Sequence, residues 1–205
     1  MPPAPRTPGT RARLLTAAVT LLRRSGLSGA GINEIVRESG APKGSVYHYF
    51  PRGKEQIATE ALALHGSAVT AFIDAAMAGR RSGPRKVEAL FRAFAKRAEE
   101  GGFDATCPAG TVCLDLDTGL EALRRPVADA FDCYVDPIAR HLDCGTPART
   151  RSFASLLLTA IEGAYLRCRA ERSSRAFHEA GKWLAPVAAP VRTPRPGAST
   201  AGSRR

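Results

Sequence analysis

The sequence predicts an all-helical protein in which a small N-terminal domain is followed by a larger helical domain. Apolar residues recur at spacings of three and four over most of the chain, and glycine and proline interrupt this pattern at intervals that suit helices. Strand-like alternation with hairpin turns is missing, and the best such run, Thr111 to Leu114, is short and isolated. With 205 residues, 44% of them hydrophobic and 24% charged, the chain can bury a core without disulfides.

The first three expected helices follow one another closely. The first runs from about Thr10, a possible N-cap, to Gly26, since glycine commonly ends helices. The second covers residues 32–39 and ends at Gly40, and the third covers residues 43–50. The inward-facing residues of the first helix are Leu14, Leu15, Ala18, Val19 and Leu22.

Six further helices are expected in the rest of the chain, which makes nine helices and no sheet. Thr146 is a suitable N-cap before Pro147, and Pro84 opens another helix from its first turn. Pro126 and Pro137 predict irregularities within one long helix. The six segments are residues 54–78, 84–100, 107–116, 119–142 and 146–172, and a last helix that carries Phe177, Ala180, Trp183, Leu184 and Val187.

Positive charge is concentrated at the two ends of the chain. Thirty Lys and Arg against 19 Asp and Glu give a formal net charge of +11. Residues 1–65 hold nine basic and four acidic residues, residues 66–185 hold 17 and 15, and residues 186–205 hold four and none. A basic N-terminal domain beside a nearly neutral middle favours a polyanion as the partner of one part of the chain. A solvated basic surface is the alternative.

The cysteine and histidine patterns favour neither disulfides nor a metal site. The five cysteines are odd in number and form no Cys-x-x-Cys pair, and His141 with Cys144 lacks a second close pair of ligands. No metal, cofactor or catalytic residue is therefore expected. The chain has no run of about 18 apolar residues and no secretory leader pattern, so we expect a cytoplasmic protein that makes no contact with membranes.

Residues 32–50 have the pattern of a helix, a tight turn and a second helix. Gly40 can adopt the left-handed backbone that such a turn needs. Ile35 packs the first of these helices inward, while Val46 and Phe50, four residues apart, bury one side of the second. The side chains left with polar tips for a DNA groove and its phosphates are Lys43, Ser45, Tyr47, His48 and Tyr49.

One continuous stretch contains Gly40-Ala41-Pro42-Lys43-Gly44-Ser45-Val46-Tyr47-His48-Tyr49-Phe50, followed by Pro51-Arg52-Gly53-Lys54-Glu55. In this stretch the chain resembles the TetR family of transcriptional regulators. The glycine before Lys54, the Cys107-Pro108 pair and Ile161-Glu162-Gly163-Ala164 are similar to the LmrA-like branch of that family.

The resemblance implies a helix-turn-helix DNA-binding domain over residues 10–53 and a helical regulatory and dimerisation domain over residues 54–187. Four prolines in residues 1–9 and four more after residue 185 predict a disordered arm at 1–9 and a disordered basic tail at 188–205.

The resemblance also implies roles in DNA binding. The residues implied to face the major groove are Lys43, Gly44 and Tyr47, and those implied to contact the DNA backbone or the groove edge are Ser45, His48 and Tyr49. Lys54 matches a lysine that meets a phosphate at the N-terminus of the following helix, where the helix dipole acts on the same anion. Gly31 stands where the family often has a threonine that caps the helix and touches phosphate, so Asn33 or Ser28 is the candidate for that contact.

The expected assembly is a homodimer on double-stranded operator DNA. One recognition helix reads only a few base pairs, so two-fold symmetry and a palindromic operator are expected. The last two long helices have more apolar residues than one small body needs, which predicts a four-helix bundle between subunits. The expected interface residues are Ala154, Leu157, Leu158, Ile161, Ala164, Phe177, Trp183 and Leu184.

The resemblance further implies a small lipophilic effector, and a mostly apolar pocket in the neutral body would hold it. Glu162 lies in an apolar run, where a carboxylate is costly unless it is paired or faces a cavity, and Arg167 or Arg169 could be its partner. His65 is interpreted as a helix-face residue rather than a ligand group. The candidate pocket residues are Phe72, Phe91, Phe94, Cys107, Phe131, Tyr134, Glu162 and Tyr165, with Phe103 as a further aromatic.

Two other functions remain open at this point. Cys107 and Cys113 could form a thiol-based redox sensor on the same scaffold. An enzyme is the other alternative, but the sequence has no nucleophile elbow, phosphate loop or His-x-Glu zinc signature, and its four histidines are scattered.

Overall fold

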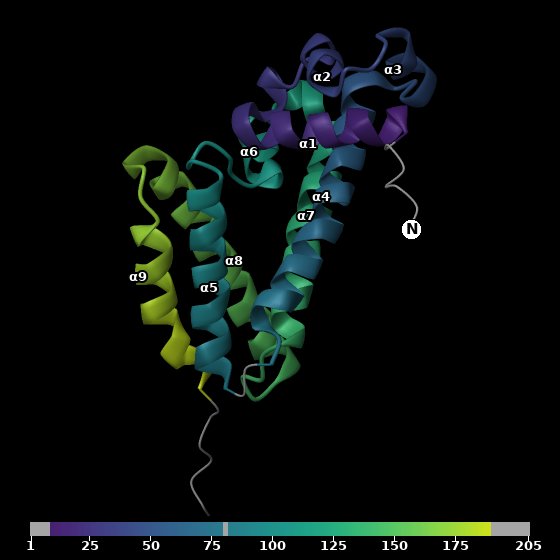
Figure 1. Cartoon of the computed structure of the whole chain (residues 1–205). Helices are drawn as coiled ribbons and strands as arrows, with labels where there is room; N and C mark the ends of the chain where they lie inside the picture. The colour runs from purple at the N-terminus through teal and green to yellow at the C-terminus, as the bar shows by residue number, and fades with distance from the viewer. Residues whose placement is uncertain (1–8, 80–81, 190–205) are drawn as a thin grey trace, which may run out of the picture.

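The computed structural model describes residues 9–79 and 82–189 and is helical throughout these ranges (Figure 1). Within them it has the nine α-helices expected and no strand. The α-helices are α1 (Thr10–Gly29), α2 (Ile32–Ser39), α3 (Gly44–Tyr49), α4 (Gly53–Met77), α5 (Gly83–Glu100), α6 (Pro108–Leu114), α7 (Glu121–Arg140), α8 (Pro147–Glu171) and α9 (Arg175–Leu184). Two short 3-10 helices are η1 (Thr118–Leu120) and η2 (Ala185–Ala188). The expected arm at 1–9 and tail at 188–205 lie outside the described residues, apart from residues 9, 188 and 189.

Helices α1, α2 and α3 form a compact cap at one end of the molecule (Figure 1). Gly40 ends α2 with φ 61° and ψ 21°, the left-handed conformation expected for the tight turn. The hydroxyl of Ser39 supports this turn by donating to the carbonyl oxygen of Val36 and accepting from the Ala41 amide. The interior of the cap includes the fully buried Val46 and Phe50, as the spacing of these two residues predicts.

The remaining helices form an elongated body below the cap (Figure 1). Helix α4 descends from the cap and packs along α7 in the same direction, so their C-terminal ends meet. There Arg140 and His141 both bind the carboxylate of Asp74, at 3.1 and 2.8 Å. On the other side of the body, α5 packs against α9, and α8 contacts both α7 and α9.

Several predicted helix ends are confirmed and one cap is wrong. Thr146 caps α8 by accepting a hydrogen bond from the Arg149 amide at 3.2 Å, and Pro84 lies in the first turn of α5. Thr10 is not an N-cap, because Gly9 occupies that position and Thr10 is already helical. Pro126 and Pro137 lie inside α7.

Helix α1 contains a break at Gly26, where the sequence analysis expected the helix to end. Gly26 has φ 66° and ψ −167°, and one further turn then runs to Gly29. This extra turn persists because Leu27 is buried in the core, with 4% of its surface exposed. Only glycine adopts such a backbone without strain.

Carbonyl oxygens just before a helix break are available to donors from outside the helix. For α1, the segment around α6 supplies these donors. The Thr111 hydroxyl donates to the carbonyl oxygen of Leu22 at 2.7 Å, and the Thr106 amide donates to that of Arg23 at 2.9 Å. In return, the side-chain Nε of Arg23 donates to the Thr106 carbonyl oxygen at 3.1 Å. Beyond the break, the Ser28 amide donates to Asp115 at 3.0 Å. These bonds join the cap to the body.

Gly26→Ala is expected to lower the free energy of unfolding by about 1–3 kcal/mol, because alanine at positive φ is strained. The added Cβ would also lie 2.6 Å from the Asp115 carboxylate that holds the Ser28 amide. Urea unfolding followed by circular dichroism measures the change. The control is Gly44→Ala, a helical position whose Cβ would have nothing within 4 Å. A Gly26→Ala protein as stable as the Gly44→Ala protein would show that the break is not required.

Candidate functional site

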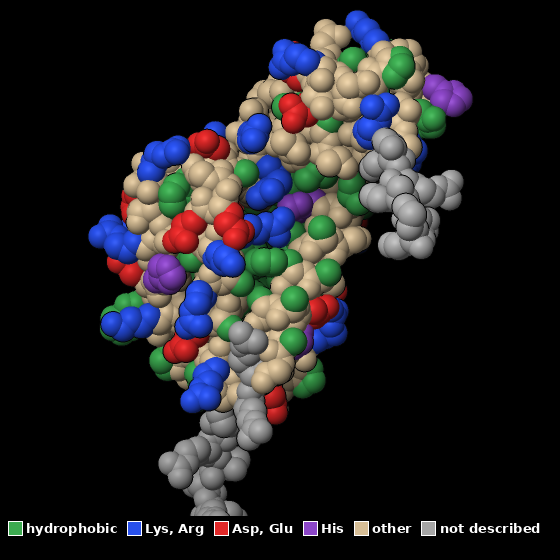
Figure 2. Space-filling view, viewed as in Figure 1, with side chains coloured by type: hydrophobic (Ala, Val, Ile, Leu, Met, Phe, Trp, Pro, Cys, Tyr) green, Lys and Arg blue, Asp and Glu red, His purple; other side chains and the backbone are tan. Residues whose placement is uncertain are grey.

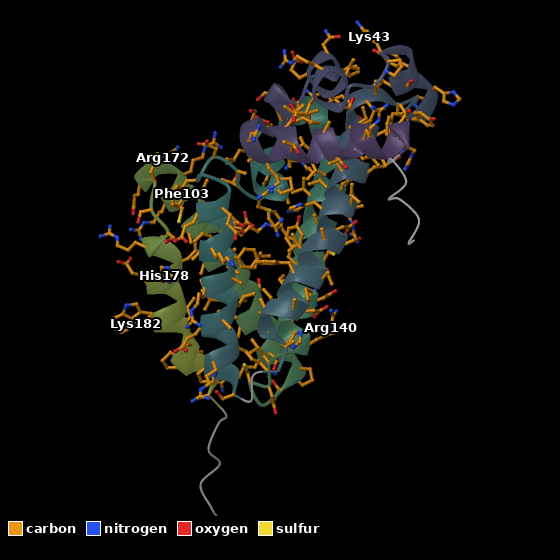
Figure 3. The ribbon with its side chains drawn as sticks, in the orientation of Figure 1. Lys43, Phe103, Arg140, Arg172, His178 and Lys182 are labelled. Carbon is orange, nitrogen blue, oxygen red and sulfur yellow. The ribbon has the colours of Figure 1, made fainter. Side chains whose placement is uncertain are left out.

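The polar face of α3 is exposed at the far end of the cap. Tyr47 has 56% of its surface exposed, and Val46 beneath it is fully buried, so the helix is anchored by one side only. Lys43 projects from the tip of the molecule, at the opposite end from Arg140 (Figure 3). Among the predicted DNA contacts, those exposed are Asn33, Lys43, Gly44, Tyr47, His48 and Tyr49, while Ser45 is half-buried. The structure therefore brings these residues to one end of the molecule.

The first turn of α4 lies next to this face, with Lys54 as its second residue and half-buried. The Arg52 amide, just before the helix, donates to the side chain of Gln56 at 3.1 Å, and Gln56 donates to Glu60. Glu60 also forms an ion pair with Arg11 of α1. This chain of contacts fixes the start of α4 against α1 and therefore fixes Lys54 relative to α3.

A narrow cavity lies in the body just below the cap, between α1, α4, α5, α7 and α8, with about 390 Å³ of space not filled by atoms, part of it open to solvent. Of the predicted pocket residues, those that line it are Phe94, Cys107, Tyr134, Glu162 and Tyr165. Phe72, Phe91, Phe131 and Phe103 do not: Phe72 packs on Phe94 from outside, Phe91 packs on α9, Phe131 lines a neighbouring groove, and Phe103 lies at the loop after α5.

Sequence reasoning missed the polar part of this cavity. Arg23 of α1, His65 of α4 and Arg97 of α5 all line it, together with Thr106. His65, Val69 and Ile73 follow one another at four-residue spacing, so a polar residue within the apolar face of α4 was the available signal. Arg23 gave no such signal, because its position depends on the contact between α1 and the segment before α6.

His65, interpreted from the sequence as a helix-face residue rather than a ligand group, is 7% exposed and lines the cavity. Burial, with a smaller contribution from the nearby guanidinium groups of Arg23 and Arg97, lowers its pKa to about 3. The imidazole is therefore neutral at physiological pH.

Glu162 faces the cavity and forms no ion pair with a basic residue of the described ranges. The two arginines suggested for it are engaged elsewhere, Arg167 with Glu171 and Glu179, and Arg169 with the Arg24 carbonyl oxygen. Burial raises the pKa of Glu162 to about 7, although a hydrogen bond with Cys107 acts in the opposite direction. Burial likewise raises the pKa of the Cys107 thiol far above its usual range, and Glu162 adds to this effect.

Most of the residues expected at a subunit interface lie instead inside one protomer. Ala154, Leu157 and Ile161 are at most 1% exposed, because this face of α8 packs toward the other helices of the body. Ala164 and Phe177 are buried in the same way, and Leu158 lines the cavity beside Ile161. Trp183 is 76% exposed and Leu184 is half-buried, so these two remain available.

Comparison with known proteins gives the family. Residues 14–61 match the family described as bacterial regulatory proteins, tetR family, and residues 84–183 match the C-terminal domain of LmrA/YxaF-like transcriptional regulators. Rv0196 of Mycobacterium tuberculosis H37Rv, named as an uncharacterized HTH-type transcriptional regulator, is 32% identical over 171 residues, which cover 80% of this chain and 86% of that relative. The chain belongs to the TetR family of transcriptional regulators.

Solved structures share the TetR fold over nearly the whole chain. Regulatory protein TetR from Rhodobacter sphaeroides superposes with a TM-score of 0.76 at 20% identity, over 87% of this chain and 98% of that one. CifR, a TetR-family regulator complexed with double-strand operator DNA, gives a TM-score of 0.71 at 18% identity, over 90% and 98%. These likenesses concern the fold.

Membership of the TetR family gives the chain a DNA-binding role in transcription and sets the enzyme alternative aside.

The geometry also disfavours an intramolecular thiol switch. Cys107 and Cys113 stand at opposite ends of α6, and six residues of helix span about 9 Å, beyond the reach of a disulfide. None of the described helices has both the length and the apolar character to cross a membrane.

Glu162→Gln is expected to stabilise this TetR-family protein by about 2–3 kcal/mol at pH 8, because the folded wild type must keep a charged carboxylate in a buried site. The pKa of Glu162 is about 7 in the folded state and has its ordinary value of 4.5 in the unfolded state. Between these two pH values the folded state keeps a proton that the unfolded state has released. Wild-type stability is therefore lost as pH rises from about 4.5 to about 7, and the glutamine variant avoids this loss.

Urea unfolding at pH 4.5 and pH 8, at one protein concentration, measures this gain. Glu88→Gln, an exposed change on α5, serves as the control and should show no pH-dependent gain. A Glu162→Gln gain of equal size at both pH values would mean that ionisation is not its cause.

Proposed function

We propose that this protein is a ligand-responsive repressor that binds a palindromic operator as a homodimer and releases it when a small lipophilic effector enters the cavity. The observation that supports this function is the position of α4, which carries Lys54 at the DNA end and His65, Val69 and Ile73 on the cavity wall. One rigid helix thus belongs to both sites. The operator complex of CifR, which has the same fold, supports the choice of operator DNA as the partner.

The proposed DNA interface is the exposed face of α3 together with the first turn of α4. Lys43, Gly44 and Tyr47 would reach base edges in the major groove, because they lie at or near the exposed start of α3. The proposed contacts to the DNA backbone are Asn33, Ser45, His48, Tyr49 and Lys54. The helix dipole at the start of α4 would add to the attraction of Lys54 for a phosphate.

The proposed subunit interface uses the exposed faces of α8 and α9 rather than their buried ones. An uncharged, exposed row on α8 follows the spacing four-three-four-three-four, which keeps its residues on one side along the helix. These residues are Ser152, Leu156, Thr159, Gly163, Leu166 and Ala170. The neighbouring helix α9 and the segment after it contribute Trp183, Leu184 and Val187. Pairing of both helices with their copies would bury this apolar surface in a four-helix bundle.

The proposed switch follows from the narrowness of the cavity. A ligand of any size must displace lining side chains or helices, and α4 is a long wall element that continues into the DNA end. A dimer must hold its two recognition helices about 34–36 Å apart to dock on successive turns of DNA. A ligand that favours a different position of α4 would therefore oppose DNA binding by its difference in affinity for the two states.

Selection of bound sequences from random duplexes is expected to yield a palindrome. Lys43→Ala should relax the preference at one base position in each half-site, at a cost of about 1–3 kcal/mol each.

Lys54→Ala should weaken binding to all sequences alike and reduce the salt dependence of log K by roughly 1.8, since a dimer loses two phosphate contacts. The control is Lys96→Ala, an exposed change on α5 in the body. An unchanged salt dependence would remove Lys54 from the interface.

Gly163→Glu is expected to convert the dimer to monomer, because it places a charge in the middle of the proposed seam. The protomer should remain folded, since a Cβ at Gly163 meets nothing within 4 Å. Sedimentation or light scattering reports the mass, and circular dichroism reports the fold. The control is Ala75→Glu, an exposed position of α4 outside the seam. A Gly163→Glu protein that stays dimeric would place the interface on another face.

A further inference from the structure

The cavity holds two guanidinium groups that have no acidic partner among the residues that the structure describes. Neither Arg23 nor Arg97 forms an ion pair with any other residue in the described ranges. Arg23 uses its Nε for the Thr106 carbonyl oxygen, and Arg97 lies over the ring of Phe72, 4.9 Å from its centroid. Both groups line the same cavity, where burial and then the charge of Arg97 lower the pKa of Arg23. Like charges brought together at a partly buried site are costly unless an anion joins them.

The other ionisable groups of the cavity do not neutralise this charge. His65 is uncharged, and burial raises the pKa values of Cys107, Tyr134 and Tyr165, so these three groups keep their protons. Glu162 is the single acid on the described wall, and its raised pKa leaves it partly protonated near neutral pH. Two permanent positive charges against at most one negative charge leave the cavity net positive.

A third polar group on the wall lacks a partner. The hydroxyl of Tyr134 is buried and has no hydrogen-bond partner of ordinary length among the described residues, although the nearby thiol of Cys107, a weak hydrogen-bonding group, acts on its pKa. A buried hydroxyl without a partner costs free energy that a polar ligand atom would recover. Apart from Thr106, the rest of the wall is apolar and comes from Val69, Ile73, Phe94, Ile138, Leu158 and Ile161.

We propose that the effector is a lipophilic anion, an aromatic or aliphatic carboxylate, whose charged group is held between Arg23 and Arg97 while its apolar body lies deeper among the aliphatic and aromatic side chains. This inference rests on the proposed function of the cavity as the effector site. Arginine suits the task because its planar group donates paired hydrogen bonds to a carboxylate. The orphan hydroxyl of Tyr134 is available to a polar substituent on the body of the ligand.

The surface around the cavity agrees with the entry of an anion. In the space-filling view, Lys and Arg side chains lie over the hollow between the cap, α4 and α5, with Asp and Glu side chains beside them on the α5 side (Figure 2). A basic rim raises the local concentration of anions and speeds their entry.

The test compares two charged probes with their neutral amides: 2-naphthoate with 2-naphthamide, and decanoate with decanamide. Calorimetry on the full-length protein without DNA is expected to show at least one carboxylate binding about tenfold more tightly than its amide. Arg97→Gln should abolish this preference while the amide binds as before, and Arg97→Lys should retain part of it. Arg85→Gln, an exposed change on the same helix, is the control and should leave both affinities unchanged.

The outcomes distinguish the anion site from the wider role of the cavity as the effector site. A carboxylate preference that is lost in Arg97→Gln but kept in Arg85→Gln supports the anion site. Equal binding of acid and amide in the wild type overturns the anion site and leaves the cavity as an effector site for neutral molecules. A carboxylate preference that survives in Arg97→Gln overturns the role of this arginine pair. Failure of all four probes to bind overturns the inference and also withdraws support from the cavity as the effector site.

Discussion

The hydrogen bonds between α1 and the segment around α6 are the constraint on which the arrangement of the two parts depends. A helix normally satisfies its own carbonyl groups, and such groups are then unavailable to a neighbour. The break at Gly26 changes this, because Leu22 and Arg23 offer their carbonyl oxygens to Thr111 and Thr106. The cap is thereby joined to the body by directional bonds as well as by the apolar contact of α1 with α4. Directional bonds fix orientation, which apolar contact alone does not.

The cavity lies directly against this junction, and Arg23 belongs to both. Its backbone oxygen accepts from Thr106, its side chain donates to Thr106, and its guanidinium lines the cavity. Any molecule that contacts Arg23 therefore acts on a residue of the cap itself. Two routes lead from the cavity toward the DNA end, one along α4 and a shorter one through α1. A response that uses both needs only small displacements in a tightly packed body.

The sequence was sufficient for local features and insufficient for contacts between distant segments. The cap was predictable because Gly40, Val46 and Phe50 lie within eleven residues and their spacing determines one packing. Helix α8 was different, since Leu156 and Leu157 are adjacent and both apolar, yet one is half exposed and the other fully buried. Periodicity identifies a helix with two apolar sides but does not show which side packs against the other helices of the same protomer. Arg23 and Arg97 are 74 positions apart, and only the fold brings them together.

The exposed indole on α9 is an intrinsic fluorescence probe in this protein. Trp183 is the single tryptophan of the chain, and it lies on the surface proposed to face a second subunit, away from the cavity wall. Indole emission shifts to shorter wavelength when water is excluded from the ring, so the natural fluorescence of the protein would follow the pairing of subunits upon dilution. A ligand that alters α4 without separating the subunits would leave this emission largely unchanged. Assembly and ligand response could then be recorded separately in one unlabelled sample.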